Sequence, residues 1–327
     1  MLDRTFITGA TGVVGSHLLS ALIAQSDDVV ALVRTNSAVR KVRTAGATGV
    51  VGNVTKPYDL ADAMWGCETV FHVAGVNEGC PRRAARMDAV NIEGAVNVVE
   101  AAASAGVKRV VLTSSVAAIG EESGTIGTEQ TIHSGSYVSA YARSKHLGEQ
   151  AAMQAAVDKD IDLVVVNPAS VQGPGRATGS AELLLRAMRS KRPWLVDVTV
   201  SIIDTEDCTN GHILAATNGK AGERYILSGA TISVAEIVEI LSGLADAPIR
   251  PRWLSEGVVR SLGMPLSRFA ASVGRSKSIC PDLVRSLLHG HRYDNSKSKS
   301  DLGLEYTPIE DTFAKTIAWF HAEGLIG

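Results

Sequence analysis

Cysteine is scarce in this sequence, and long apolar runs are missing. Four cysteines occur in 327 residues, none of them in a C-x-x-C pair, so the sequence predicts a reducing compartment, no disulfide framework and no structural zinc site with closely spaced ligands. No apolar stretch reaches the ~18 residues that cross a membrane. The first strand is expected to start at Arg4, which leaves no room for a signal peptide. Together these absences predict a cytoplasmic protein without a metal or a membrane partner.

An excess of one charge is absent too. The 32 basic and 34 acidic side chains give a formal net charge of −2, so no general basic field favours nucleic acid as a partner. A hydrophobic fraction of 45% and a charged fraction of 20% are typical of a globular chain. With 31 glycines and only 5% aromatic residues, the composition fits the tight turns of an α/β enzyme better than an all-β fold.

Short β-branched runs alternate with longer helical segments through the first half of the chain. The expected strands are 4–8, 29–33, 49–54, 69–73, 110–113 and 161–167. The expected helices are 13–25, 57–65, 87–105 and 139–157. The strands are apolar without alternation, which is typical of a parallel sheet covered by helices on both faces. The sequence therefore predicts an α/β protein with a doubly wound Rossmann sheet, whose ligands bind at the carboxyl ends of the strands.

The regular pattern loosens after Gly173. The second half is expected to hold helices at 181–190, 207–217, 234–244 and 311–321 and strands at 200–203 and 224–227. We expect residues 1–173 to form a dinucleotide-binding domain and residues 174–327 to form mostly a smaller substrate-binding lobe. Residues 207–227 are the part of that half that could pack back on the first domain. The polar stretch Ser296–Ser300 is expected to be a surface loop.

A glycine-rich turn follows the first expected strand. It reads G-x-x-G-x-x-G from Gly9 through Gly12 to Gly15 and leads into a helix. The first glycine permits a tight turn, the second lets the backbone approach a pyrophosphate, and the third lets helix and strand pack closely, while the helix N-terminus offers free N–H groups. The sequence therefore predicts a dinucleotide site here. The expected cofactor contacts are Gly9, Thr11, Gly12, Val13, Val14 and Gly15.

The end of the second expected strand bears on which dinucleotide binds. NAD-dependent enzymes place an acidic residue there, which holds the hydroxyls of the adenosine ribose. This chain has Arg34 instead, and a guanidinium can pair with a 2′-phosphate through two hydrogen bonds. The alternative is a solvent-exposed arginine without such a role. We expect NADP as the cofactor, with NAD as the alternative.

A tyrosine and a lysine four residues apart open the long helix before the sixth strand. Tyr141 and Lys145 lie on one helical face at this spacing. An ammonium group beside the phenol would lower its pKa from ~10, so that it can exchange a proton near neutral pH. Tyr137 has no lysine four residues on. Ser115 follows the fifth strand and could donate a hydrogen bond to a carbonyl oxygen; capping of the strand end is the alternative for it and for Ser114.

These motifs, in this order, resemble the extended short-chain dehydrogenase/reductase family over nearly the whole chain. The residues that carry the resemblance are Thr8–Gly15, Val70–Gly75, Asn91–Ala101, Thr113–Ser115, Tyr141–Lys145, Asn167–Pro168, Gly173–Gly175 and Gly222–Gly229. The most similar branch holds dihydroflavonol reductases, cinnamoyl-CoA reductases, hydroxysteroid dehydrogenases and a bacterial group of hopanoid-associated sugar epimerases.

For catalysis, the resemblance implies three roles. Tyr141 would be the acid and base, Lys145 would hold the nicotinamide ribose and tune Tyr141, and Ser115 would polarise the substrate carbonyl. Ser115 matches the catalytic serine of the family better than Ser114, because Val116 follows it directly.

For the cofactor, the resemblance implies further contacts. The segment His72–Gly75 would line the adenosine half, and three residues after the sixth strand would flank the nicotinamide. The contacts so implied are Val73, Ala74, Gly75, Tyr141, Lys145, Pro168, Ala169 and Val171, with Asn53 and Val54 near adenine. One position departs from the family, because Asn53 replaces an Asp whose side chain contacts adenine. An amide can still hydrogen-bond adenine, so we expect an altered contact and not a loss of binding.

Three functions stay open on the sequence alone. The leading hypothesis is an NADP-dependent oxidoreductase that interconverts a ketone or aldehyde and its alcohol through the serine, tyrosine and lysine. A nucleotide-sugar epimerase or dehydratase is the second. The resemblance places the acid–base pair of dehydratases where Val116 and Ala117 stand, and a diphosphate-binding arginine where Val200 stands. A non-catalytic dinucleotide sensor is the third, disfavoured because all three catalytic residues are present.

The motifs do not name the substrate. We expect a small, mainly apolar carbonyl compound or alcohol, bound by four variable loops at 76–83, 117–136, 176–180 and much of 247–292. The two long helices at 87–105 and 139–157 could pair across a two-fold axis in a homodimer, although burial within one chain accounts for the same apolar faces.

Overall fold

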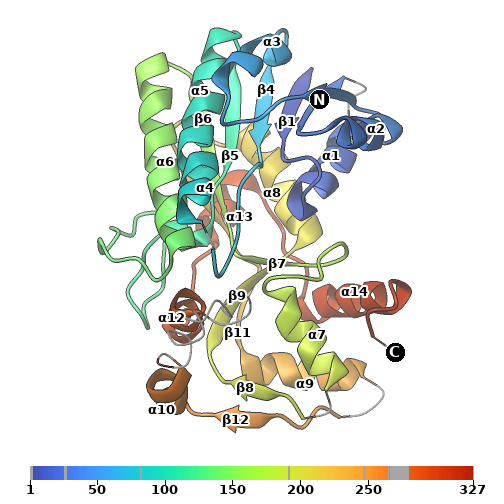
Figure 1. The fold of residues 1–327 in the computed structure, drawn as a ribbon, viewed down its shortest axis with the longest axis vertical. Coiled ribbons are helices and arrows are strands. Elements are labelled where there is room, and N and C mark those ends of the chain that lie inside the picture. Colours follow the sequence, from blue (N-terminus) through green and yellow to red (C-terminus); the bar gives the residue numbers. More distant parts are fainter. Residues whose placement is uncertain are drawn as a thin grey trace.

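A computed structural model of the protein describes residues 3–25, 28–81, 83–190, 192–245, 248–263, 265 and 280–326. A seven-stranded parallel sheet dominates one half of the molecule (Figure 1). Its strands are β1 (Thr5–Thr8), β2 (Val29–Val33), β3 (Thr48–Val51), β4 (Thr69–His72), β5 (Arg109–Thr113), β6 (Asp162–Pro168) and β10 (Arg224–Leu227). Their order is β10-β6-β5-β4-β1-β2-β3, so the strand order reverses between β1 and β4. The doubly wound fold predicted from the sequence is confirmed.

Helices cover both faces of this sheet. Successive strand residues point to opposite sides, and both sets are apolar and buried, so each face needs a covering layer. Phe6 and Val70 pack on one side with apolar residues of α3 (Ala61–Met64), α5 (Gly94–Ser104) and α6 (Ala140–Lys159). Ile7 and Phe71 pack on the other side with α1 (Val13–Gln25), α2 (Asn36–Thr44) and α8 (Thr205–Asn218). All four strand residues are fully buried. The two packed layers therefore hold the carboxyl ends of the strands in fixed positions.

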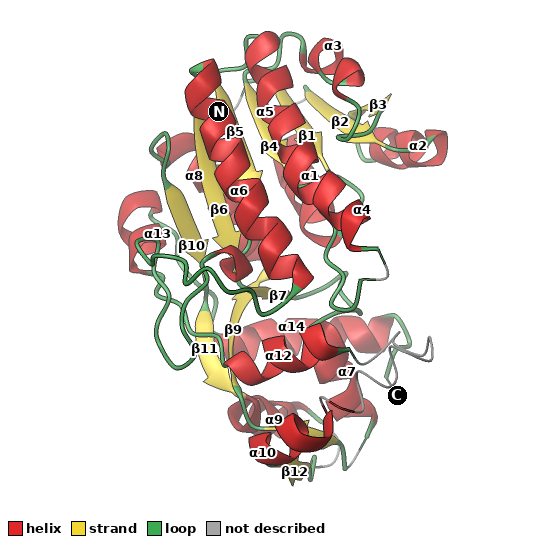
Figure 2. Cartoon of the chain, turned by 60° about the vertical axis from the view of Figure 1, so that its left-hand side comes forward, coloured by secondary structure: helices red, strands yellow, loops and turns green. Residues whose placement is uncertain are grey.

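A second lobe lies beyond the carboxyl ends of the large sheet (Figure 2). It contains one sheet of β7 (Ser170–Gln172), β9 (Thr199–Asp204) and β11 (Ala230–Ser233), and another of β8 (Trp194–Val196) and β12 (Arg252–Leu254). Its helices are α7 (Ala181–Arg189), α9 (Val234–Leu244), α10 (Glu256–Val258), α12 (Pro281–His289) and α14 (Ile309–Ala322). A separate apolar core that includes Leu184, Ile237 and Phe313 holds this lobe together. Within the described ranges, no helix is both long and apolar enough to cross a membrane.

The chain returns from the second lobe to the large sheet. There α8 covers one face and β10 pairs with β6. Helix α13 (Ser296–Leu302) also packs there, with Ser298 and Leu302 buried. The prediction of a surface loop at Ser296–Ser300 is therefore wrong. The polar run forms a helix with one buried edge, which ends at Gly303 with a φ of 74°.

The first of the two long helices is interrupted. In place of one helix at 87–105, the chain forms α4 (Ala84–Asp88), a π-helical turn η2 (Ala89–Glu93) and then α5. Gly148 of α6 packs against this turn so closely that a Cβ there would lie 2.0 Å from the carbonyl oxygen of Asn91. Turns of this kind frequently mark functional sites. The remaining short turns are η1 (Pro57–Asp59), η3 (Val116–Ala118) and η4 (Val259–Gly263).

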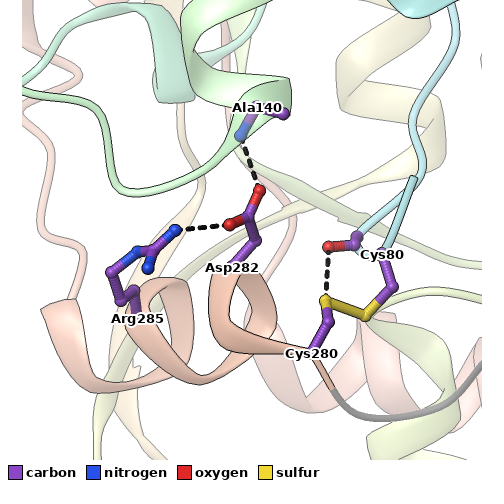
Figure 3. The surroundings of a disulfide bond; sticks show 6 residues. Cys80, Ala140, Cys280, Asp282 and Arg285 are labelled. Carbon is purple, nitrogen blue, oxygen red and sulfur yellow. Dashed lines mark hydrogen bonds and ion pairs between the residues drawn. A yellow bond between two sulfur atoms is a disulfide. The ribbon is translucent and has the colours of Figure 1, made fainter. Parts of the chain in front are cut away.

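A disulfide joins Cys80, in the loop after β4, to Cys280, immediately before α12 (Figure 3). The two cysteines are 200 residues apart in the sequence, so no local spacing could have paired them. The prediction of no disulfide is wrong for this reason, and the low cysteine count no longer argues for a reducing compartment. Cys67 and Cys208 are free thiols buried in the protein.

A second contact next to the disulfide reaches the start of α6. Asp282, in the first turn of α12, accepts a hydrogen bond at 2.8 Å from the backbone N–H of Ala140 and also pairs with Arg285 (Figure 3). The second lobe thus anchors the N-terminus of α6, the helix that carries Tyr141.

Candidate active site

The glycine turn between β1 and α1 has the geometry of a phosphate-binding loop. Gly9 has a φ of 75°, and a Cβ on it would lie 2.6 Å from the backbone nitrogen of Ala74. A Cβ on Gly15 would lie 2.1 Å from the carbonyl oxygen of Gly9, so the helix touches the turn. Thr11 and Gly12 are exposed, and the first N–H groups of a helix have no partner within it. The residues present therefore fit the pyrophosphate of a dinucleotide.

Alanine substitution should separate the roles of two of these glycines. Gly12→Ala should weaken cofactor binding and lower the free energy of unfolding less than Gly15→Ala does, because its Cβ would meet the carbonyl oxygen of Gly9 at 3.3 Å and not at 2.1 Å. Gly15→Ala should lower the free energy of unfolding by about 1–3 kcal/mol, as overpacking does. Cofactor titration and urea unfolding of both variants measure the two effects. Equal destabilisation by both substitutions would remove the reason for assigning Gly12 to the ligand.

The predicted adenosine contacts lie at the ends of β2 and β3, which are neighbouring strands. Arg34 directly follows β2 and is exposed, so a ligand can reach its guanidinium. Asn53 is half-buried beyond β3, and its side-chain oxygen accepts a hydrogen bond from the N–H of Thr55 at 3.2 Å. Val54 is buried, and its contact with the cofactor stays a prediction.

Thr8 and His72 fix the point where the strand order reverses. Thr8 Oγ1 lies 2.7 Å from His72 Nδ1 and also accepts a hydrogen bond from the N–H of Ala74 at 3.1 Å. Burial lowers the pKa of His72 to about 3, so its ring is neutral. Val73 and Ala74 are half-buried and Gly75 is exposed, so a ligand can reach these three residues. His72 is buried and contributes to the packing of the sheet.

Ser115 and Tyr141 come together from different elements. Ser115 follows β5 and opens η3, where its hydroxyl accepts a hydrogen bond from the N–H of Ala117 at 3.2 Å. Tyr141 is the second residue of α6, which Ser139 caps through the N–H of Ala142 at 3.1 Å. The Ser115 hydroxyl also lies beside the phenol of Tyr141 and acts to lower its pKa. Ser115 therefore caps η3 and also lies next to Tyr141. A capping role and a role as hydrogen-bond donor to the substrate are compatible.

Lys145 lies one helical turn after Tyr141, and its ammonium group points to the end of β5. Nζ donates a hydrogen bond to the carbonyl oxygen of Thr113 at 2.8 Å. It also borders Gly75, where a Cβ would approach it to 3.4 Å. Burial lowers the pKa of Lys145 to about 8, against an opposing attraction from Glu149. The ammonium group of α6 thus lies between the segments that follow β4 and β5.

The pKa of Tyr141 moves in the direction opposite to the prediction. Burial raises it above the ordinary value of about 10, and the Ser115 hydrogen bond and the positive charge of Arg176 only oppose that rise. The prediction that the pKa of Tyr141 lies below its ordinary value is therefore wrong for the protein without cofactor. Desolvation of the phenol raises the pKa by more than the charge of Arg176 lowers it. At neutral pH the Tyr141 phenol carries its proton.

Asn91 is a site residue that the sequence reasoning missed. Its side chain projects from the π turn, donates hydrogen bonds at 2.9 Å to the Val76 carbonyl and to the Ser144 hydroxyl, and accepts one from the Val76 N–H at 2.8 Å. It thereby holds α6 against the loop that follows β4. Asn91 begins one of the segments that resemble the family, but only the π turn shows where its amide points.

A buried polar network fixes the backbone at Ser115. Asn167, at the end of β6, donates hydrogen bonds to the Ser115 carbonyl oxygen at 3.0 Å and to Glu149 at 2.7 Å. Glu149 is 4% exposed and pairs with Arg224 of β10 at 3.1 Å. Sequence reasoning missed this pair because the two charged residues lie 75 positions apart.

The expected nicotinamide and substrate regions adjoin these residues. Pro168, Ala169 and Val171 lie where β6 passes into β7, and all three are buried, so their contact with a nicotinamide stays a prediction. Arg176, from the loop after β7, brings positive charge to Tyr141, so a substrate bound there would meet a cation. Of the four loops expected to bind substrate, residues 82, 247, 264 and 266–279 lie outside the described ranges.

Comparison with known proteins places this site in a family. The model described as "NAD dependent epimerase/dehydratase family" matches residues 5–228, more than two thirds of the chain. The chain belongs to this family. A Synechocystis sp. protein named "Putative dihydroflavonol 4-reductase" is 33% identical over 100% of this chain and 97% of its own. Cinnamoyl-CoA reductase 1 of Petunia hybrida is 27% identical over 97% of this chain and 92% of its own.

A solved structure supports the same assignment. The crystal structure of the protein named gox2253, 29% identical, covers 99% of this chain and 100% of its own with a TM-score of 0.86. The resemblance to extended short-chain dehydrogenases/reductases is thus confirmed. The protein is an NAD(P)-dependent oxidoreductase that acts on CH–OH or carbonyl groups.

Proposed function

We propose that this epimerase/dehydratase-family protein reduces a ketone or an aldehyde with NADPH. The observation that carries the proposal is the meeting of Ser115, Tyr141 and Lys145 at the carboxyl end of β5. The raised pKa of the half-buried Tyr141 phenol favours its protonated form, which is the form that donates a proton while a carbonyl is reduced. Alcohol oxidation would need the phenolate, which burial disfavours.

Each residue of the site has a separate task in this reaction. The Ser115 hydroxyl donates a hydrogen bond to the carbonyl oxygen as negative charge develops on it, and Tyr141 gives that oxygen its proton. Lys145 binds the ribose next to the nicotinamide and holds positive charge near the phenol. Bound NADPH supplies the hydride. Asn91 keeps α6 in position, and Asn167 does the same for the backbone of Ser115.

A preference for NADPH over NADH follows from Arg34. Arg34→Ala should weaken NADPH binding by about ten- to a hundredfold, because a charge-assisted contact to the 2′-phosphate is worth ~1.5–3 kcal/mol, and should leave NADH binding unchanged. Fluorescence titration of both cofactors measures this. Arg43→Ala, at the far end of α2, removes an exposed arginine with the same charge and is the matched control. Equal affinities for both cofactors in the wild type, unchanged by Arg34→Ala, would refute the preference.

The proposed substrate is mainly apolar and is not a nucleotide sugar. Val200 is a half-buried residue of β9, and η3 offers valine and alanine where a dehydratase has acids. A diphosphate buried without cationic partners would cost several kcal/mol. Arg176 is the group that could offset this cost, so the test must include nucleotide sugars.

A substrate screen tests the proposal. We expect NADPH oxidation with at least one class among aromatic aldehydes, cyclic ketones and steroid ketones, and weak binding of UDP- and GDP-sugars. Tight binding of a sugar nucleotide, with an epimerised product and no net change in NADPH, would overturn the reductase and support an epimerase.

The proposal includes the organisation of the molecule. Residues 1–173 would bind the dinucleotide and residues 174–327 would mostly build the substrate lobe, while β10 completes the large sheet and α8 covers one of its faces. The neighbouring helices α5 and α6 (Figure 1) would pair with a second copy in a homodimer, which light scattering of the purified protein tests. A cytoplasmic location is also proposed, and the disulfide makes an oxidising compartment the alternative.

A further inference from the structure

Two histidines and a tyrosine surround a buried carboxylate where the loop after β5 meets the segment after α12. Glu121 belongs to that loop and is 5% exposed. His289 ends α12, and His291 and Tyr293 follow it. Oε1 of Glu121 lies 2.8 Å from His291 Nδ1, 3.4 Å from His289 Nε2 and 2.7 Å from Tyr293 Oη. Four polar atoms from two distant parts of the chain therefore converge on one point.

The spacing of these atoms is close to that of a zinc site. Zinc binds imidazole nitrogen and carboxylate oxygen at about 2.0–2.2 Å in a tetrahedron, which puts neighbouring ligand atoms about 3.3 Å apart. The ligand atoms of Glu121, His289 and His291 all lie within 4.8 Å of one another. Glu121 Oε1 and His291 Nδ1, 2.8 Å apart, must separate slightly to admit an ion.

The backbone around the cluster is held in place by contacts of its own. The Ser123 hydroxyl donates to the His289 carbonyl oxygen at 2.8 Å. The N–H of Gly127 donates to the Arg292 carbonyl oxygen at 2.9 Å, and the N–H of Asp294 donates to the Gly127 carbonyl oxygen at 3.0 Å. Because the ligands are ordered before an ion arrives, binding pays little of the usual ordering cost.

The cluster borders solvent on its histidine side. The side chains of His291 and His289 are 27% and 14% exposed, which provides a path from solvent.

We infer that Glu121, His289 and His291 form a zinc site that fastens α12 to the loop leaving β5. Two imidazoles with a carboxylate suit zinc, whereas calcium and magnesium prefer oxygen alone. Water completes the tetrahedron beside the Tyr293 hydroxyl, and the site shares no residue with the one at Tyr141.

Metal analysis of the full chain tests this inference. Protein without a purification tag is stripped with a chelator, dialysed against zinc chloride and measured by mass spectrometry of the metal. We expect one zinc per wild-type chain and a higher Tm with zinc. His291→Gln and His289→Gln, which remove ligands from different positions, should each weaken binding at least tenfold, since even residues behind the ligands typically contribute 10–100-fold. His321→Gln, on the exposed end of α14, is the control and should bind as the wild type does.

Cobalt substitution gives a readout that needs no variant. We expect the wild type to take up one cobalt ion with the strong visible absorption of four-coordinate cobalt, displaced by zinc. A wild type that binds no zinc, or binds it with the same affinity as both glutamine variants, would overturn the inference and leave a hydrogen-bonded clamp in which histidine carries a proton. A six-coordinate cobalt spectrum would contradict a tetrahedral site.

Discussion

Tyr141→Phe is expected to lower kcat by about 10²–10⁴-fold, the usual contribution of a general acid. The phenylalanine ring keeps the packing of the phenol but has no proton to give to the carbonyl oxygen. Since that proton matters in the transition state and not in cofactor binding, the Kd for NADPH should stay within about a factor of two of the wild-type value. Steady-state kinetics and cofactor titration on the same preparation measure both quantities.

Tyr137→Phe is the matched control for this substitution. Tyr137 lies four residues before Tyr141, ahead of α6, and its ring packs on His133, with centroids 4.9 Å apart. Its hydroxyl has no proposed role, so the variant should keep wild-type turnover. Loss of activity in Tyr137→Phe with retained activity in Tyr141→Phe would show that the wrong tyrosine is assigned.

Lys145→Met is expected to damage turnover and cofactor binding together. The substitution keeps an unbranched side chain but removes the ammonium group that reaches the Thr113 carbonyl. A lost charge-assisted hydrogen bond to the ribose should raise the Kd for NADPH by about ten- to a hundredfold. The pKa of Lys145 is about 8, so its charge is present below that pH and is lost as the pH rises through it. Wild-type cofactor affinity should therefore decline above about pH 8.

The pH dependence distinguishes a role at the site from a purely structural one. The decline above pH 8 should disappear in Lys145→Met, because no titrating ammonium group is left. Lys159→Met, at the exposed end of the same helix, should retain both the affinity and the decline. If Lys145→Met binds NADPH as well as the wild type at pH 7, the ribose contact assigned to Lys145 is wrong.

The parts of the protein predictable from sequence are those set by local patterns. The glycine turn after β1, the apolar strands and the spacing of Tyr141 and Lys145 depend on neighbours within a few residues, and the doubly wound sheet followed from them. Each of these features combines a residue type with a position on a strand or helix. For that reason the order of the motifs indicated the family before any geometry was known.

The parts not predictable from sequence depend on distant residues. Cys80 pairs with a cysteine 200 residues away, and Glu149 pairs with a cation 75 residues away. The direction of the Tyr141 pKa depends on how deeply the fold buries the phenol, which spacing along a helix does not reveal. Asn91 reaches the site through a π turn that the apolar pattern of 87–105 does not mark.

Deuterium transfer tests the central claim most directly. NADPH labelled with deuterium at the transferable C4 position is incubated with the wild-type protein and an active ketone or aldehyde from the screen, and mass spectrometry follows the product. We predict one deuterium on the new carbinol carbon and one NADPH consumed for each product molecule, with both abolished in Tyr141→Phe. A converted substrate that carries no label, with the NADPH concentration unchanged, would contradict the proposed reduction.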